Sequence, residues 1–283
     1  MNLRDAQPSP IGWQARLDLR YSASAGERTV LSHRRHTGPL LVQKPFYPEG
    51  PRVCHSTLVH PPGGIAGGDR LELHVEVEAG AHAVITTPGA AKWYRSTGNQ
   101  AAQRCELSVG RDAMLEWLPQ PSIVFDGARG MQSLRVRLGS NARYIGWEIV
   151  CLGRTARGER FETGEMHTRT DIEGEDRRLW SDCAAIQGGG VLLRSRAGLA
   201  GHPVTGLFLA GGIDIDRDLI ERCRQVEPTA PSLCGVTSLP AILAARFVGD
   251  STEVAWQYFT ALWQLARPVL MGRVACSPRI WQT

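Results

Sequence analysis

The sequence predicts a mainly β fold, a single domain of many short strands in stacked sheets, β-helix-like or sandwich-like, with two helices. Apolar and polar residues alternate in many short segments, as they do in strands that bury one face. The chain has 283 residues, and its 31 glycines and 17 prolines punctuate most gaps between these segments, which is typical of all-β proteins. No linker divides the chain, so we expect a flexible tail over residues 1–11 and one domain over residues 12–283.

The clearest strand is expected at Leu71–Glu78, where apolar and polar residues alternate along the whole segment. Ala79 and Gly80 form a turn, after which His82–Thr87 resumes as a strand. Gly164 is a candidate bulge within a later strand. The further expected strands are Cys105–Val109, Met114–Leu118, Ser133–Leu138, Tyr144–Leu152, Arg160–Thr170, Val191–Arg196, Val204–Ala210 and Ala241–Val248.

Two helices are expected in the last third of the chain, a short charged one at Asp218–Gln225 and a long one at Ser251–Arg267. Asp250 and Glu253 have the spacing of a capping box, which satisfies free backbone N–H groups at a helix start. Pro268 is expected to end the long helix. Its apolar residues cover more than one face, so the helix is either buried in the core of this chain or covered by a partner.

Composition excludes several classes of protein. The formal net charge is only +4, from 32 basic and 28 acidic residues, which does not favour nucleic-acid binding. No apolar run is long enough for a membrane span or a signal peptide. The seven cysteines contain no CxxC pair, which favours a reducing compartment over a disulfide framework. We therefore expect a cytoplasmic protein that binds neither nucleic acid nor a membrane.

The densest motif is His60–Asp69, which contains two Gly-Gly pairs. It is not a phosphate-binding loop, because no Lys-Ser or Lys-Thr pair follows and the next segment is a strand. We interpret it as a tight double turn, with Asp69 either capping the turn or pointing into a cavity. The histidines and cysteines have none of the spacings typical of zinc sites.

Nucleophilic catalysis has little support, since no GxSxG motif is present. Glu148, beside Trp147, and Glu159 are the candidate acid/base pair. They leave open a β-rich hydrolase or carbohydrate-active enzyme as the alternative function.

Six segments occur together in a recognisable order: Pro45–Glu49, His60–Asp69, Thr87–Ser96, Leu115–Gln120, Cys151–Arg154 with Gly158–Glu159, and Pro278–Thr283. Each segment is a weak signal alone, but the series is specific. From about Gly12 to Thr283 the chain resembles the urease accessory proteins of the D type, called H in some species.

The resemblance implies a maturation chaperone and scaffold without catalytic activity. It implies that the protein binds the urease apoprotein subunits on one side and the F-type accessory protein on the other. The F-type protein recruits the G-type GTPase, which carries nickel. Nickel then passes in transit through a tunnel in the D-type protein, which binds no permanent cofactor and holds no metal tightly.

The resemblance also suggests which residues line the tunnel or contact the partner proteins. A tunnel lined by a few carboxylates attracts a divalent ion and releases it again, whereas nitrogen and sulfur ligands retain nickel. The expected tunnel or interface carboxylates are Asp69, Glu148, Asp182 and Glu159. Separately from the resemblance, the excess apolar width of the long helix places the docking surface for the F-type protein toward the C-terminus. The aromatic anchors expected there are Trp256, Trp263 and Trp281.

Overall fold

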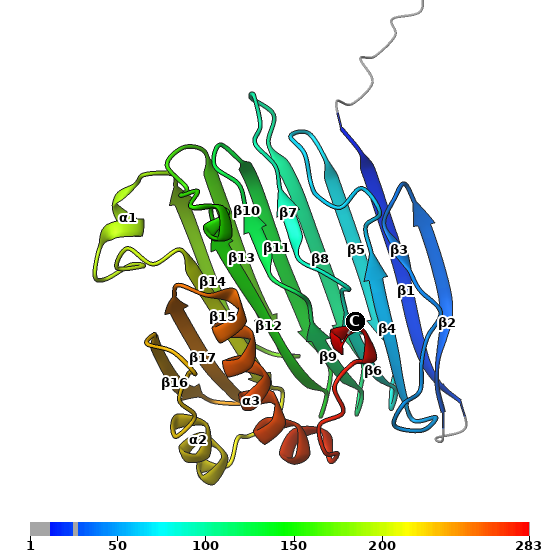
Figure 1. The fold of residues 1–283 in the computed structure, drawn as a ribbon. Coiled ribbons are helices and arrows are strands. Elements are labelled where there is room, and N and C mark those ends of the chain that lie inside the picture. The colour runs from blue at the N-terminus through cyan, green and yellow to red at the C-terminus, as the bar shows by residue number, and fades with distance from the viewer. Residues whose placement is uncertain (1–11, 25–27, 283) are drawn as a thin grey trace, which may run out of the picture.

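The computed structural model describes residues 12–24 and 28–282, which form two facing β-sheets and a helical layer (Figure 1). The expected tail over residues 1–11 lies outside the described residues. The first sheet has seven strands, in the spatial order β14 (Arg178–Gln187), β13 (Glu165–Glu173), β11 (Arg129–Leu138), β8 (Ala101–Val109), β5 (Arg70–Val77), β1 (Gln14–Ser24) and β2 (Arg28–Thr37).

The second sheet has ten strands. Eight lie in the order β16 (Leu233–Leu239), β17 (Ile242–Gly249), β15 (Val204–Gly211), β12 (Arg143–Leu152), β9 (Met114–Leu118), β6 (His82–Thr86), β4 (Val53–Val59) and β3 (Leu41–Val42). The short strand β10 (Ser122–Val124) pairs in parallel with the end of β12 on one side and with β7 (Ala91–Trp93) on the other. The prediction of a mainly β fold with stacked sheets is confirmed.

The chain winds between the two sheets as a β-solenoid. It passes from β5 to β6, back to β8, across to β9, back to β11 and across to β12. Each return places a strand parallel to the one before it, so β1, β5, β8, β11 and β13 are parallel in one sheet. The strands β4, β6, β9 and β12 are likewise parallel in the other. Antiparallel strands complete both ends of the winding.

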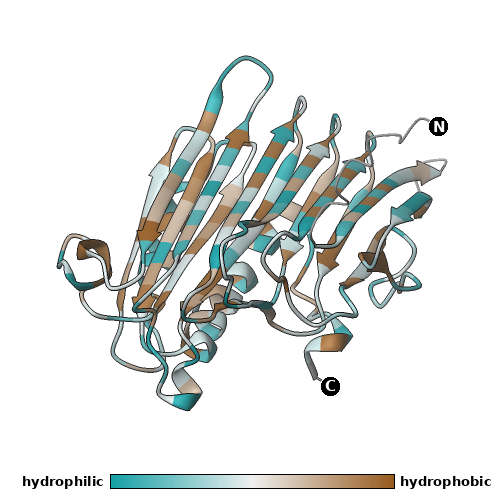
Figure 2. Cartoon of the chain, turned by 90° about the horizontal axis from the view of Figure 1, so that it is seen from above, coloured by the Kyte–Doolittle hydropathy of each residue, from teal (hydrophilic) through white to brown (hydrophobic). Residues whose placement is uncertain are grey.

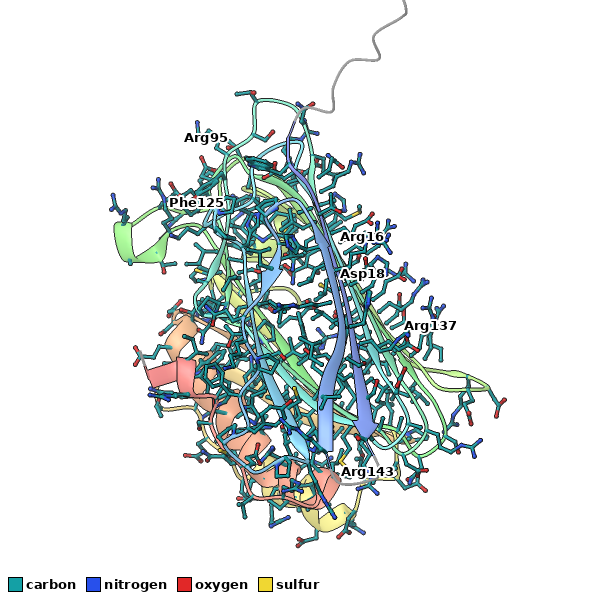
Figure 3. The ribbon with its side chains drawn as sticks, turned by 90° about the vertical axis from the view of Figure 1, so that its right-hand side faces the viewer. Arg16, Asp18, Arg95, Phe125, Arg137 and Arg143 are labelled. Carbon is teal, nitrogen blue, oxygen red and sulfur yellow. The ribbon has the colours of Figure 1, made fainter. Side chains whose placement is uncertain are left out.

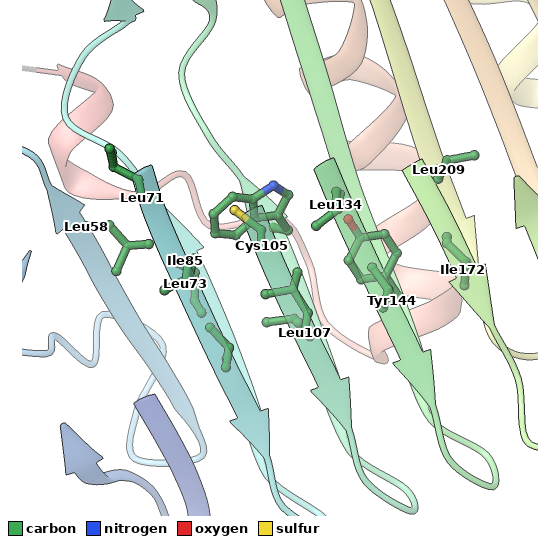
Figure 4. Packing of buried hydrophobic residues seen from close by; sticks show 14 of the residues in the cluster. Leu58, Leu71, Leu73, Ile85, Cys105, Leu107, Leu134, Tyr144, Ile172 and Leu209 are labelled. Atoms are coloured by element: carbon green, nitrogen blue, oxygen red, sulfur yellow. The ribbon is translucent and has the colours of Figure 1, made fainter. Parts of the chain in front are cut away.

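The alternating sequence pattern explains this packing. In β5, Leu71, Leu73 and Val75 are buried between the sheets, where they join a core shown in Figure 4. The bands of hydropathy along the strands are visible in Figure 2. The opposite face of the seven-stranded sheet is covered by charged side chains, among them Arg16 and Asp18 (Figure 3).

A second core lies on the outer face of the ten-stranded sheet. The helices α3 (Thr252–Met271) and α2 (Arg217–Arg224) cover this face (Figure 1), and Phe208 of β15 packs there against Phe259 of α3. One side of the long helix is therefore buried in the core of its own chain, as the first of the two alternatives proposed, and this burial accounts for much of its apolar width.

The structure corrects the prediction of a strand at Val191–Arg196. This segment forms a short helix, α1 (Val191–Arg194), that begins after Gly190. Three apolar residues in a row carry no alternating pattern, so the sequence does not distinguish strand from helix here. The segment lies outside both sheets, and the side chain of Val191 is 77% exposed. Two 3₁₀ turns complete the helical elements, η1 (Thr155–Arg157) and η2 (Arg279–Gln282).

Both predicted ends of the long helix are also corrected. Ser251, rather than Asp250, is the N-cap, and its hydroxyl accepts hydrogen bonds from the first turn. The helix continues through Pro268 and ends before Gly272, which has a φ of +65°. Pro268 lies on the exposed side, so its missing N–H interrupts the helix only there, while burial of Met271 holds the last turn in place.

Candidate functional site

A cavity of about 350 Å³ lies inside the solenoid, between the two sheets. Both sheets contribute apolar side chains to its wall, including Leu71 and Leu73 from β5 and Trp117 from β9. The polar residues of the wall are fewer: Gln103, Ser122, Gln132 and Glu148 from the longer sheet strands and β10, Lys92 from β7, and His60, Thr87 and Gln120 from the loops. A cavity that is largely apolar with a few convergent polar groups is the usual form of a functional pocket.

Glu148 is the acidic group of this wall, and it lies on β12. One carboxylate oxygen accepts a hydrogen bond from Gln132 Nε2 at 2.7 Å, and the other accepts one from Thr170 Oγ1 at 2.8 Å. Gln132 in turn accepts a hydrogen bond from Ser122. Burial raises the pKa of Glu148, its two neutral donors oppose this rise, and the charge of Asp182 adds to it.

Asp182 lies further along the space between the sheets, on β14. It is directly opposite Thr170 in the β13–β14 register, so both side chains project from the same face of the sheet. Thr170 bonds to Glu148 of the other sheet, which shows that this face is the inner one. Asp182 forms an ion pair with Arg246 of β17 at 2.8 Å. The structure thus brings together two of the predicted carboxylates, Glu148 and Asp182.

Asp69 has a different environment. It is 2% exposed, and its two oxygens accept hydrogen bonds from the backbone N–H groups of Trp13 and Ala66, each at 2.7 Å. Of the two roles that the sequence left open, the structure shows the cap of the turn. The glycines of the motif permit close approach, since a Cβ on Gly64 would lie 2.4 Å from the ring of Tyr94.

Glu159 lies in the loop that follows η1. Arg154 donates two hydrogen bonds to one of its oxygens, and the backbone N–H of Asp126 donates to the other. These bonds, led by the contact with Arg154, lower the pKa of Glu159 to about 2. Within the described part of the chain, Glu148 and Glu159 share no hydrogen-bond partner, so the structure does not assemble them as an acid/base pair.

The three predicted tryptophan anchors meet on the outer face of the ten-stranded sheet. Trp281 packs against Trp256 at 4.7 Å and against Trp263 at 5.8 Å between ring centroids, and Trp147 completes the cluster. Trp263 is fully buried, so it fixes α3 to the sheet and presents no surface to a partner. Trp256 and Trp281 remain half-buried.

A buried network of charged groups beneath α3 was not expected from the sequence. Arg267 has no exposed side-chain surface, and its guanidinium bonds to both Glu116 and Glu49 at distances between 2.7 and 3.0 Å. His82 bonds to Glu116 at 2.7 Å, and His55 bonds to Glu49 at 2.6 Å. The signal for this network was an acidic residue inside the apolar stretch Leu115–Leu118 and a basic one inside an apolar helix.

The described residues were compared with the requirements of a metal site and of a membrane-spanning helix. Over residues 12–24 and 28–282, no three His, Cys, Asp or Glu side chains are grouped so that they could hold a metal ion. None of the helices in these ranges is both long enough and apolar enough to cross a membrane.

Comparison with known proteins identifies the family. A family model described as UreD urease accessory protein matches residues 14–282. The chain belongs to the UreD urease accessory protein family. It is 47% identical to the urease accessory protein UreD of Dechloromonas aromatica (strain RCB) over 274 residues, which cover 96% of this chain and 95% of that protein.

Two other UreD proteins show that the similarity covers the whole chain. The one from Azoarcus sp. (strain BH72) is 47% identical over 281 residues, covering 99% of this chain and 97% of the relative. The one from Methylobacillus flagellatus is 44% identical over 283 residues, covering 100% and 99%. The family resemblance found in the sequence is thus confirmed, and membership in the UreD family supports a role in urease maturation.

Proposed function

We propose that this UreD protein is a non-catalytic scaffold through which nickel passes on its way to the urease apoprotein. In this proposal the F-type accessory protein docks on the chain, the G-type GTPase binds through the F-type protein, and nickel is cargo in transit. The same proposal places the protein in the cytoplasm.

The observation that carries the proposal is the cavity inside the solenoid, with Glu148 in its wall and Asp182 further along the same inner face. Glu148 receives hydrogen bonds from two neutral donors and forms no ion pair with a described residue, so its charge remains available to a cation. Asp182 is already paired with Arg246, so it would attract a cation less strongly. Such a sequence of weak oxygen ligands favours passage over retention.

The docking surface for the F-type protein is proposed at the exposed side of α3 and the C-terminal segment. Trp256 and Trp281 are half-buried there, and the apolar side chains of Val269 and Val274 are 43% and 78% exposed. Because Trp263 is buried, the partly exposed residues are the ones that could contribute to binding.

The test of nickel passage is the variant Glu148→Gln, which keeps the shape of the side chain and removes its charge. In an activation assay with urease apoprotein, the F-type and G-type proteins, nickel, bicarbonate and GTP, we expect nickel insertion on the order of tenfold slower. The readout is the nickel content of urease, followed by its activity. The matched control is Glu106→Gln, which changes a carboxylate on the outer face of the seven-stranded sheet.

The same variant is expected to slow nickel insertion but to raise the thermal stability of the chain. The pKa of Glu148 is raised in the folded protein, so its contribution to stability is full below the ordinary pKa and is lost as the pH rises through the folded-state pKa. At pH 7 we therefore expect Glu148→Gln to unfold about 2 °C higher than the parent chain. This result would separate lost passage from lost folding. Wild-type nickel insertion by both Glu148→Gln and Asp182→Asn would contradict the route.

A further inference from the structure

An open groove of about 620 Å³ lies at the end of the solenoid, between residues 30–34 of β2 and residues 44–47, which follow β3. The start of β2 is tied to the loop before β4, because Thr29 donates hydrogen bonds to the carbonyls of Pro51 and Arg52. From Ser32 to Thr37, the backbone of β2 is hydrogen-bonded to β1 and to no other described strand. This half of β2 is therefore a free sheet edge beside a groove.

The groove is basic on both sides. Residues 28–48 contain four arginine or lysine residues and two histidines, and they contain no aspartate or glutamate. These basic residues are Arg28, His33, Arg34, Arg35, His36 and Lys44. Within the described chain none of them forms an ion pair, and the side chains of residues 32–37 are all exposed. The nearest following acid, Glu49, is held in the buried network.

The strand register distributes these charges over both faces of the edge. His33 and Arg35 lie opposite Arg20 and Asp18 of β1, on the outer face of the sheet. Arg34 lies opposite the buried Leu19, so it projects on the groove side, where Lys44 forms part of the opposite wall. Asp18 does not neutralise this edge, because its carboxylate is engaged by Arg16 of its own strand.

We propose that the β2 edge binds an acidic, extended segment of a partner protein, which adds to the seven-stranded sheet as one more strand. Strand addition uses the backbone N–H and C=O groups that a free edge leaves unpaired, and the alternating side chains supply specificity. Acidic side chains on either face of the added strand would meet arginine or histidine. Ser32–Thr37 would accommodate about six residues, or roughly 20 Å of strand. This site is separate from the cavity and does not depend on nickel passage.

The test measures fluorescence anisotropy of a labelled ten-residue peptide of alternating threonine and glutamate with the full chain at low ionic strength. We expect the double variant Arg34→Glu, Arg35→Glu to weaken binding about tenfold or more. The matched control is Arg104→Glu, Arg137→Glu, which makes the same change of net charge on the outer face of the same sheet. We expect the control to bind within about twofold of the parent chain. Lys44→Glu, at the groove wall, is a second variant should the first fail to fold.

Two altered peptides test strand addition itself. A peptide with glutamine in place of glutamate and a peptide with N-methyl groups on alternate residues are both expected to bind about tenfold more weakly. Equal binding of the methylated peptide would overturn strand addition, since charge attraction alone would explain it. An equal loss in the Arg104, Arg137 control would overturn the location.

Two other occupants of the edge would also overturn the proposal. One is a single-stranded oligonucleotide that displaces the peptide and binds more tightly than it does. The other is a second copy of this chain, detected as a dimer by light scattering that the Arg34→Glu, Arg35→Glu variant dissociates.

Discussion

Arg267 and Glu116 form an ion pair in which neither side chain has exposed surface, and this environment shapes how the protein responds to acid. Although burial alone raises the pKa of Glu116, the hydrogen bond from His82 and the charge of Arg267 outweigh it and lower that pKa to about 2. Trp263 Nε1 donates a further hydrogen bond to Glu116 at 2.6 Å. The carboxylate of Glu116 is therefore fully ionised and fully satisfied in a place without water contact.

The sign of the pH dependence follows from this lowered pKa. Glu116 contributes stability that is present above its ordinary pKa near 4.5 and is lost as the pH falls toward about 2. We expect the free energy of unfolding of the parent chain, measured with urea, to decrease between about pH 5 and pH 2. In Glu116→Gln this decrease should be smaller.

At neutral pH the same substitution leaves the buried charge of Arg267 with one carboxylate partner fewer. We expect it to lower the free energy of unfolding by about 3 kcal/mol. The control is Glu76→Gln, which removes an exposed partner of Arg20 and should cost less than about 1 kcal/mol. Equal losses for the two variants would contradict the special role of the buried network.

At the scale of elements, the contact between β15 and α3 depends on a missing side chain. Gly206 of β15 lies directly beneath Phe259 of α3, and a Cβ at this position would be 2.7 Å from the aromatic ring. Phe259 is fully buried, so its ring has little room to move away. Glycine here lets the helix approach the sheet closely enough to form the second core.

We expect Gly206→Ala to lower the free energy of unfolding by about 1–3 kcal/mol, because overpacking forces the helix or the ring to shift. Thermal unfolding followed by circular dichroism measures this effect. Gly235→Ala on β16 is the matched control, since nothing lies within 4 Å of a Cβ there. A lower melting temperature in the control than in Gly206→Ala would argue against overpacking as the cause.

At the scale of the whole molecule, the solenoid and the C-terminal helix are mutually dependent. The ten-stranded sheet is apolar on both faces, with the solenoid core on one side and α3 and α2 on the other. Without α3, Phe208 and Phe247 would be exposed on the uncovered face. An apolar patch of this kind promotes aggregation.

We therefore expect a chain that ends at Gly249 to aggregate or to remain insoluble, as measured by size-exclusion chromatography and dye binding to exposed apolar surface. The full chain under identical conditions is the reference. A monodisperse truncated protein with native-like circular dichroism would show that the solenoid is stable without its helical layer.

Much of the fold could be predicted because the alternation of apolar residues is local. The strand Met114–Leu118 was predicted with the observed bounds, and Tyr144–Leu152 began one residue late. By contrast, the sequence analysis does not predict β1, β2, β3, β4, β7, β10, β14 or β16. Of these, β2 and β16 carry exposed residues on both faces, which leaves no clear alternating pattern. The candidate site was partly predicted, since Glu148 and Asp182 were both expected and lie on one inner face.

The sequence by itself determined the mainly β class, about half of the strands, both longer helices and the family, because each depends on residues close together in the chain or in a fixed order. Only the tertiary structure decided which charged residues pair, since Glu116 and Arg267 are far apart in sequence and are brought together by the packing of α3. It also decided that Asp69 caps a turn and that Trp263 is buried. Charge and burial at these positions depend on which distant elements the solenoid brings into contact, and a local pattern carries no such information.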